Sequence, residues 1–146
     1  LIDDNWKIKI GDFGLSRFFS LDDDEDNRGR IGTPHWMAPE VLKGEKYRLC
    51  ADIFSFGMIL WEILSLEIPY YGVDPYQVIS LVADQRQIVR VPEKGNKLIR
   101  EITERCLNYE PSKRPQLDEL VELLGKAKSH YKLYFNNFFI FLKFFF

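Results

Sequence analysis

Two short acidic motifs in this sequence could carry chemistry, and they stand at the two ends of one long loop. Asp12-Phe13-Gly14 follows a strand-like stretch at 7–10, and Ala38-Pro39-Glu40 precedes the first helical periodicity. The carboxylate of Asp12 offers the hard oxygen that hard cations prefer, although a lone aspartate here would equally suit a turn. Either tripeptide alone recurs by chance. Their order, their separation of 26 residues and the elements around them make the pair a specific pattern.

Four runs of residues resemble segments of protein kinases. Residues 7–17 (Lys-Ile-Lys-Ile-Gly-Asp-Phe-Gly-Leu-Ser-Arg) are similar to the metal-binding segment of that family, and residues 32–40 (Gly-Thr-Pro-His-Trp-Met-Ala-Pro-Glu) to the end of its activation segment. The resemblance continues through residues 51–62 and 111–115 and covers the chain to about residue 128. It implies the C-terminal part of a kinase domain, beginning just before Asp-Phe-Gly.

The resemblance implies catalytic and cofactor-binding roles for the loop residues. Phosphoryl transfer depends mostly on positioning and on Mg²⁺, which neutralises charge spread over the phosphate oxygens. Asp12 would be the catalytic metal ligand, Phe13 would pack beneath it, and Gly14 would let the backbone turn, so the three form a cofactor-binding tripeptide. Thr33 matches a threonine whose hydroxyl helps to hold the catalytic base. The alternative for Thr33 is a plain turn residue before Pro34.

Three further residues have structural roles in the resemblance. Glu40 and Arg114 match a buried ion pair that ties the activation segment to the helical body. Such a pair is costly to break, because one buried charge is then left alone. Asp52 matches the aspartate that opens the central helix and braces the catalytic loop, and it also suits the N-cap position of that helix.

The long loop contains possible phosphorylation sites and most of the acidity of the chain. Phosphate on Ser16, Ser20 or Thr33 could order this segment through nearby arginines, although most loop serines are simply solvated. The formal net charge is −2, and an unbroken acidic run at 22–26 accounts for the excess of acid. The charge is therefore local, and we expect no nucleic-acid partner.

Several segments that kinases need for activity have no match in this sequence. In the family, the glycine-rich loop, the strand lysine, the helix glutamate and the His-Arg-Asp catalytic loop all precede this segment. We therefore expect ATP and Mg²⁺ to bind only together with that missing N-terminal part. By itself, the chain is expected to be inactive.

The sequence combines motifs of tyrosine kinases and of serine/threonine kinases, and this combination indicates which residue type would be phosphorylated. Residues 36–40 and 55–62 look like tyrosine kinases, whereas Gly32-Thr33-Pro34 looks like serine/threonine kinases. This mixture is typical of the tyrosine-kinase-like group, whose members mostly phosphorylate Ser and Thr of protein substrates. The alternative function is a non-catalytic scaffold lobe that binds a kinase or a substrate through the activation segment and residues 74–87. The sequence does not indicate an oligomeric state.

The apolar periodicity predicts the elements that must position these residues. Residues 1–11 read as a short β-hairpin and residues 15–34 as a long loop. Residues 52–66 are apolar almost all round, which is typical of a helix buried on every side. The predicted fold class is mainly α: a protein-kinase-like C-terminal lobe with a short N-terminal β-hairpin and without the N-terminal lobe.

Three more helices are expected after the central one. The first begins with Asp74 as N-cap and Pro75 at the first helical position and runs to about residue 87. The second covers about 97–108. The last begins near Pro115 and carries one apolar stripe. That stripe consists of Leu117, Leu120, Val121 and Leu124.

Composition and the C-terminal residues complete the expected organisation. The chain is 46% hydrophobic and 29% charged, which is typical of a globular protein. Its two cysteines, Cys50 and Cys106, lack metal-binding spacing and suit buried thiols in a reducing, cytoplasmic compartment. We expect residues 1–128 to form the partial kinase domain. Residues 129–146 would be an unstructured or spurious aromatic tail, too short to span a membrane, although an interfacial anchor is the alternative.

Overall fold

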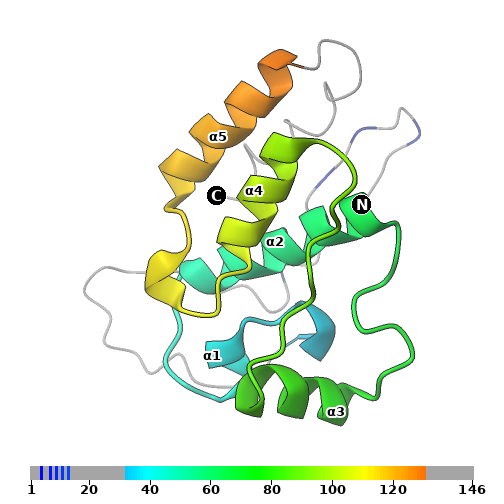
Figure 1. The fold of residues 1–146 in the computed structure, drawn as a ribbon. Helices are drawn as coiled ribbons and strands as arrows, with labels where there is room; N and C mark the ends of the chain where they lie inside the picture. Colours follow the sequence, from blue (N-terminus) through cyan, green and yellow to red (C-terminus); the bar gives the residue numbers. More distant parts are fainter. Residues whose placement is uncertain are drawn as a thin grey trace. The chain divides into compact units, whose positions relative to one another are not determined.

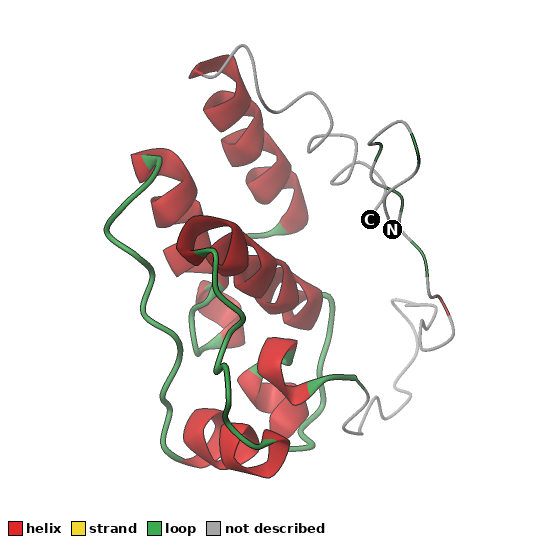
Figure 2. Ribbon diagram, turned by 90° about the vertical axis from the view of Figure 1, so that its right-hand side faces the viewer, coloured by secondary structure: helices red, strands yellow, loops and turns green. Residues whose placement is uncertain are grey.

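The computed structural model describes residues 4, 7, 9, 11 and 13 and the continuous stretch 32–130, with side chains to residue 127. The chain divides into two compact units, one of residues 20–116 and one that combines residues 1–19 with 117–146. Helices and turns make up all the regular structure of the described residues, which include no strand (Figure 2). The mainly α fold is thus confirmed. The predicted hairpin and most of the predicted long loop lie outside the described residues.

Helix α2, Cys50–Ser65, forms the centre of the larger unit (Figure 1). Its sequence is apolar on nearly every side, so it can be covered by several other elements at once. Four of its large side chains are at most 1% exposed, and burying such a side chain stabilises the fold by about 1.5–3 kcal/mol. These side chains are Phe54, Phe56, Met58 and Leu60. The central helix expected over 52–66 is therefore present and begins two residues earlier.

Helix α4, Lys97–Cys106, packs closely against α2. Asn96 is its N-cap, and the Oδ1 atom of Asn96 accepts hydrogen bonds from the backbone N–H of Leu98 (2.7 Å) and Ile99 (3.2 Å). The two helices approach where α2 has Gly57, because a Cβ atom at that position would lie 2.7 Å from the Cβ of Cys106. A side chain of any size at residue 57 would force the helices apart.

Short elements cover another side of α2. They are the 3₁₀ turn Pro34–Trp36, helix α1 (Pro39–Leu42), helix α3 (Pro75–Ile79) and the π-helical turn Ser80–Asp84. Figure 1 shows α1 and α3 together at the end of this unit, below α2. Their apolar side chains form one core with those of α2, contributed by residues such as Val41, Val78 and Val82.

Helix α3 begins where the sequence predicts, but its regular α-helical part ends earlier than predicted. The Asp74 side chain accepts from the N–H of Tyr76 (2.9 Å), and Pro75 stands at the first helical position. The regular α-helix ends at Ile79, and a wider π-helical turn follows to Asp84 instead of a helix to residue 87. Val82 and Ala83 in that turn are buried, so the wider turn keeps both in the core.

Helix α5, Leu117–His130, belongs to the other unit. Leu120, Leu124 and Ala127 are buried, but Val121 is 43% exposed, so the predicted stripe is wrong at this position. Each helical residue turns by about 100°, which places Val121 to one side of the face formed by the three buried residues. No helix in the described part of the chain combines the length and the apolar character needed to cross a lipid bilayer.

Candidate functional site

Most of the loop residues singled out in the sequence lie outside the described residues. These are Asp12, Gly14, Ser16 and Ser20. Phe13 is described and is 65% exposed, and Asp12, beneath which its ring is expected to pack, lies outside the described residues.

Thr33 begins the described end of the loop and is exposed. Its carbonyl oxygen accepts from the N–H of Trp36 (3.1 Å), which closes the 3₁₀ turn. Its backbone is extended, with φ −92° and ψ 118°, and its side chain does not cap the turn. The Thr33 hydroxyl is thus open to groups outside the described structure.

Glu40 and Arg114, which are 74 residues apart, form a buried ion pair. Nη1 of Arg114 donates to Oε1 of Glu40 at 2.6 Å, and Nη2 donates to Oε2 at 2.7 Å. The side chain of Arg114 is fully buried and that of Glu40 is 6% exposed. Parallel charge-assisted bonds of this kind are strong and directional, and here they join helix α1 to the turn that follows α4.

The remaining donors of Arg114 bind backbone carbonyls. Nε donates to Asn108 (2.8 Å), Nη1 to Cys50 (2.8 Å) and Nη2 to Tyr109 (3.2 Å). The guanidinium also lies 5.0 Å from the centre of the Phe54 ring, which suits a cation–π contact. One side chain therefore holds together α1, the start of α2 and the chain after α4.

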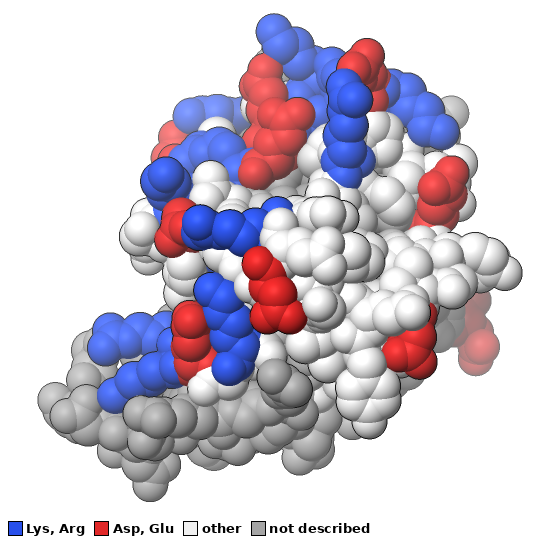
Figure 3. Space-filling view, turned by 60° about the horizontal axis from the view of Figure 1, so that its bottom comes forward, with Lys and Arg blue, Asp and Glu red and all other residues white. Residues whose placement is uncertain are grey.

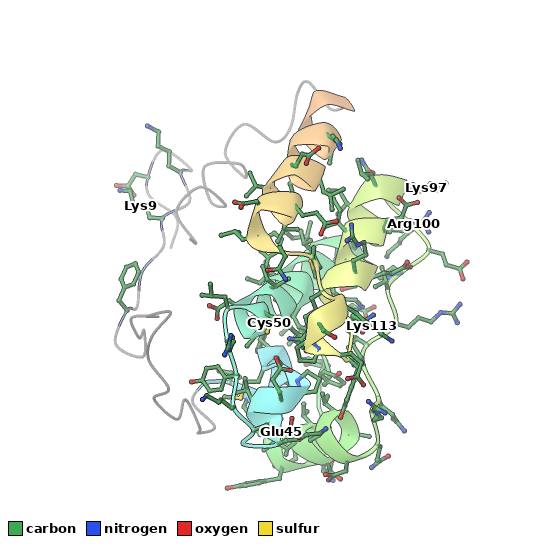
Figure 4. The ribbon with its side chains drawn as sticks, turned by 90° about the vertical axis from the view of Figure 1, so that its left-hand side faces the viewer. Lys9, Glu45, Cys50, Lys97, Arg100 and Lys113 are labelled. Atoms are coloured by element: carbon green, nitrogen blue, oxygen red, sulfur yellow. The ribbon has the colours of Figure 1, made fainter. Side chains whose placement is uncertain are left out.

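Cys50 is the first residue of α2 (Figure 4), and the charges of Glu40 and Arg114 both act on its thiol. Burial, and after it the negative charge of Glu40, raises the pKa of Cys50 above its ordinary value. The thiol therefore stays protonated at neutral pH and is a poor nucleophile. Cys50 is only partly buried, whereas Cys106 is fully buried, so the expectation of two buried thiols is wrong for Cys50.

A second set of contacts, which the sequence did not reveal, holds the turn Pro34–Trp36 against α2. Nε1 of Trp36 donates to Oε2 of Glu62 at 2.7 Å, and Oγ of Ser55 donates to the carbonyl oxygen of Trp36 at 2.9 Å. All three residues belong to the kinase-like runs, but only the tertiary structure pairs residues 26 positions apart.

Asp52 stands in the first turn of α2 and is not its N-cap. The helix begins earlier because the carbonyl oxygens of Arg48 and Leu49 accept from Ala51 and Asp52, which leaves Leu49 at the cap. The residue is exposed, yet nearby protein atoms displace enough water to raise the pKa of its carboxyl group. The N-terminal end of a helix carries a partial positive charge, which stabilises the negative charge of the Asp52 carboxylate.

The described residues thus form an anchored end of a loop and no complete reaction centre. Within the described ranges, no three His, Cys, Asp or Glu side chains come together as a metal site would require. A carboxylate such as that of Asp12 has the donor chemistry that Mg²⁺ prefers. What the described geometry provides is the attachment of the turn Pro34–Trp36 to α2 and of helix α1 to the chain that follows α4.

Comparison with known proteins places this geometry in context. A family described as protein tyrosine and serine/threonine kinase matches residues 1–124. The chain is 39% identical over 129 residues to the probable serine/threonine-protein kinase drkB of Dictyostelium discoideum, an alignment that covers 88% of this chain and 18% of that protein.

Other relatives carry related names. The chain is 37% identical over 124 residues to the serine/threonine-protein kinase CTR1 of Arabidopsis thaliana, covering 85% of this chain and 15% of CTR1. It is 34% identical over 127 residues to the dual specificity protein kinase shkD of Dictyostelium discoideum, covering 86% of this chain and 17% of shkD. The chain therefore spans less than a fifth of the length of these relatives.

Proposed function

Because this chain belongs to the protein tyrosine and serine/threonine kinase family, we propose that it is the C-terminal lobe of a kinase that phosphorylates Ser or Thr of a protein substrate. The family and the mainly α lobe agree with the sequence prediction, and the relatives bear serine/threonine and dual specificity names. The observation that best supports the proposal is the buried Glu40–Arg114 pair. It attaches the segment that resembles the end of an activation segment to the helical body.

The proposed roles follow the chemistry of each side chain. Asp12 would supply a carboxylate to Mg²⁺, which when bound neutralises the charge on the phosphates of ATP. Thr33, exposed at the start of the anchored segment, would place its hydroxyl beside the catalytic base. Phe13 and Gly14 would shape the backbone around Asp12. Glu40 and Arg114 would hold the segment in place while substrate binds.

The same loop offers candidates for regulation. Ser16, Ser20 and Thr33 would be phosphorylation sites, because a phosphate in this region could bind the arginines of the loop and order it. Mass spectrometry of the protein isolated from its natural source would test this. Phosphate on none of the three hydroxyls under activating conditions would contradict it.

The test of the main proposal begins with the coding sequence upstream of Leu1. If it continues in frame through a His-Arg-Asp motif and a strand lysine, the protein that includes both parts should transfer phosphate from radiolabelled ATP to a protein substrate. Phosphoamino-acid analysis of the product would then show phosphoserine or phosphothreonine in excess over phosphotyrosine.

Variants of that longer protein separate catalysis from folding. Asp12→Asn should abolish transfer without changing the melting temperature, because the amide keeps the shape but not the charge of the metal ligand. Asp4→Asn, a matched change in the same region, should leave transfer intact. Equal activity of the Asp12→Asn and unmodified proteins would refute the assignment. A longer protein with no transfer activity, but with intact binding to a kinase or substrate, would favour the scaffold alternative.

A further inference from the structure

A cavity lies between the end of α4 and the stretch of chain that leads from the π-helical turn to α4. Residues 86–92 of this stretch have no regular secondary structure, and Figure 1 shows this part of the chain crossing α2. The cavity measures about 360 Å³, and sites for small molecules in proteins usually measure about 300–1,000 Å³. All its lining residues belong to the larger unit. The cavity is therefore large enough for a small organic molecule.

Apolar side chains form one part of the cavity lining. They are Ile88, Val89 and Val91 from the stretch and Leu107, which directly follows α4. The first three are half-buried and pack against the core around α2, and Leu107 is only 5% exposed. Apolar surface of this kind favours contact with apolar groups over contact with water.

Hydrogen bonds to the backbone hold the lining stretch in place. Nε1 of Trp61, on α2, donates to the carbonyl oxygen of Arg90 at 2.8 Å. The hydroxyl of Tyr70 donates to the carbonyl oxygen of Gln87 at 3.2 Å. The stretch is thus tied at two points to residues that precede it, and a wall held in this way loses less conformational freedom when a ligand binds.

Three charged side chains complete the cavity lining, and their charges do not balance. Arg90 and Glu93 form an ion pair at 2.9 Å. Glu104 lies in the last turn of α4, and within the described part of the chain its carboxylate has no ion pair or hydrogen bond. The carbonyl end of a helix carries a partial negative charge, which adds to that of the carboxylate. The neighbouring Arg105 does not line the cavity. One unpaired negative charge therefore borders an apolar cavity.

The wider surface does not supply a field of one sign. On the face drawn in Figure 3, basic and acidic side chains of the described residues often stand next to each other. A mixed surface of this kind does not concentrate ions of either sign over a broad area. Selectivity for a charged ligand must therefore come from the groups that line the cavity.

We propose that this cavity binds a small primary amine that carries an apolar ring or chain. The apolar part would contact the valine, isoleucine and leucine side chains, and the ammonium group would pair with the carboxylate of Glu104. An anion with the same apolar part would face the unpaired carboxylate and be disfavoured. Binding of the amine is non-covalent and needs neither ATP nor phosphate transfer, so it stands or falls separately from the proposed kinase function.

The experiment is an NMR titration of the ¹⁵N-labelled 146-residue chain with phenethylamine. The backbone N–H signals of Val91 and Leu107 should shift and saturate with a Kd on the order of 1 mM, which is typical of so small a ligand. The N–H signal of Ala38, which does not line the cavity, should stay in place. Phenylacetate has the same ring and the opposite charge, and we expect no saturable shift with it.

Variants test the source of the selectivity. Glu104→Gln should weaken binding of phenethylamine by about fivefold, because an exposed ion pair contributes modestly. Arg90→Gln should strengthen it by about twofold, because the change frees the carboxylate of Glu93 beside the cavity. Glu45→Gln is the matched control. It removes an exposed carboxylate of the same unit that pairs with Lys43 and does not line the cavity, so the affinity should be unchanged.

The spectra of the unliganded variants verify that each is folded. Absence of saturable shifts at Val91 and Leu107 would overturn the proposal, and so would binding of phenylacetate with the affinity of the amine. Unchanged affinity in Glu104→Gln would do the same. An equal loss in Glu45→Gln would also overturn it, since the amine would then respond to the overall charge of the protein and not to the cavity.

Discussion

At the scale of the single residue, Arg114 uses every donor of its guanidinium. A guanidinium has five N–H donors, and here they make five hydrogen bonds, two to Glu40 and three to backbone carbonyls. A lysine could supply the charge but not this planar set of donors. The role of Arg114 is therefore tied to the geometry of its guanidinium as much as to its charge.

Substitution of Arg114 should destabilise the fold strongly. Arg114→Ala leaves the Glu40 carboxylate buried and alone, which should lower the free energy of unfolding by about 3–5 kcal/mol. Urea denaturation of the 146-residue chain measures the effect. Arg86→Ala is the control, because Arg86 pairs with Glu110 on an exposed surface and such pairs contribute about 0–1 kcal/mol. Similar denaturation midpoints for the two variants would contradict the importance of the buried pair.

Tyr70 should make the stability depend on pH in alkaline solution. Burial raises the pKa of Tyr70 from 10.0 to about 12. The folded state therefore favours the neutral phenol, a contribution that is complete below about pH 10 and is lost as the pH rises toward 12. Denaturant melts between pH 9 and 11.5 should show less alkaline loss in Tyr70→Phe than in the unmodified chain. Tyr71→Phe, which changes an exposed ring, serves as the control, and identical pH profiles for all three proteins would refute the argument.

Between elements, the contact of α2 with α4 depends on the absence of a side chain at Gly57. Gly57→Ala should destabilise the fold by about 1–3 kcal/mol, because the new Cβ would lie 2.7 Å from the Cβ of Cys106 and the helices would have to move apart. The intrinsic helix preference of alanine acts in the opposite direction and is smaller, about 1 kcal/mol.

Gly125→Ala is the matched control for this prediction. Gly125 is also inside a helix, and a Cβ at that position meets no atom within 4 Å. The alanine there should be neutral or slightly stabilising, by up to about 1 kcal/mol. Urea melts of both variants give the comparison. Stabilisation by Gly57→Ala would show that α2 and α4 can separate without cost.

Helices α2, α3 and α4 show how far the sequence pattern predicts where elements begin and end. The cap residues Asp74 and Asn96 act over a few positions, and α3 and α4 begin directly after them. Helix α2 has no such cap and begins two residues before the apolar pattern over 52–66. The π-helical turn Ser80–Asp84 was not predictable in this way. It places Val82 and Ala83 in a core formed by distant segments, and that requirement overrides the local winding.

For the whole molecule, the proposed function predicts that the 146-residue chain made alone transfers no phosphate from ATP to a protein. Asp12 can act on Mg²⁺ only while other groups hold the phosphates and a base accepts the proton of the substrate, and no match to those groups is found in this sequence. A filter-binding assay with radiolabelled ATP, with and without Asp12→Asn, measures this. Transfer that depends on Asp12 in the isolated chain would contradict the prediction.

The sequence by itself determined the family, the mainly α class and the positions of the main helices. These depend on residue order and on interactions between positions a few residues apart, which are visible in the sequence. The resemblance also pointed to Glu40 and Arg114, but their bonding, the enclosure of the guanidinium and its ties to Cys50, Asn108 and Tyr109 came from the tertiary structure.

Only the tertiary structure decided which side chains are covered. Val121 and Phe13 are apolar yet exposed, while the polar Thr103 is fully buried and its hydroxyl donates to the carbonyl oxygen of Ile99 at 2.7 Å. The same holds for Tyr70 and Tyr71, neighbours of the same type of which only the first is enclosed. Burial depends on whether distant segments supply a surface at that point, and this is a property of the packed chain in three dimensions.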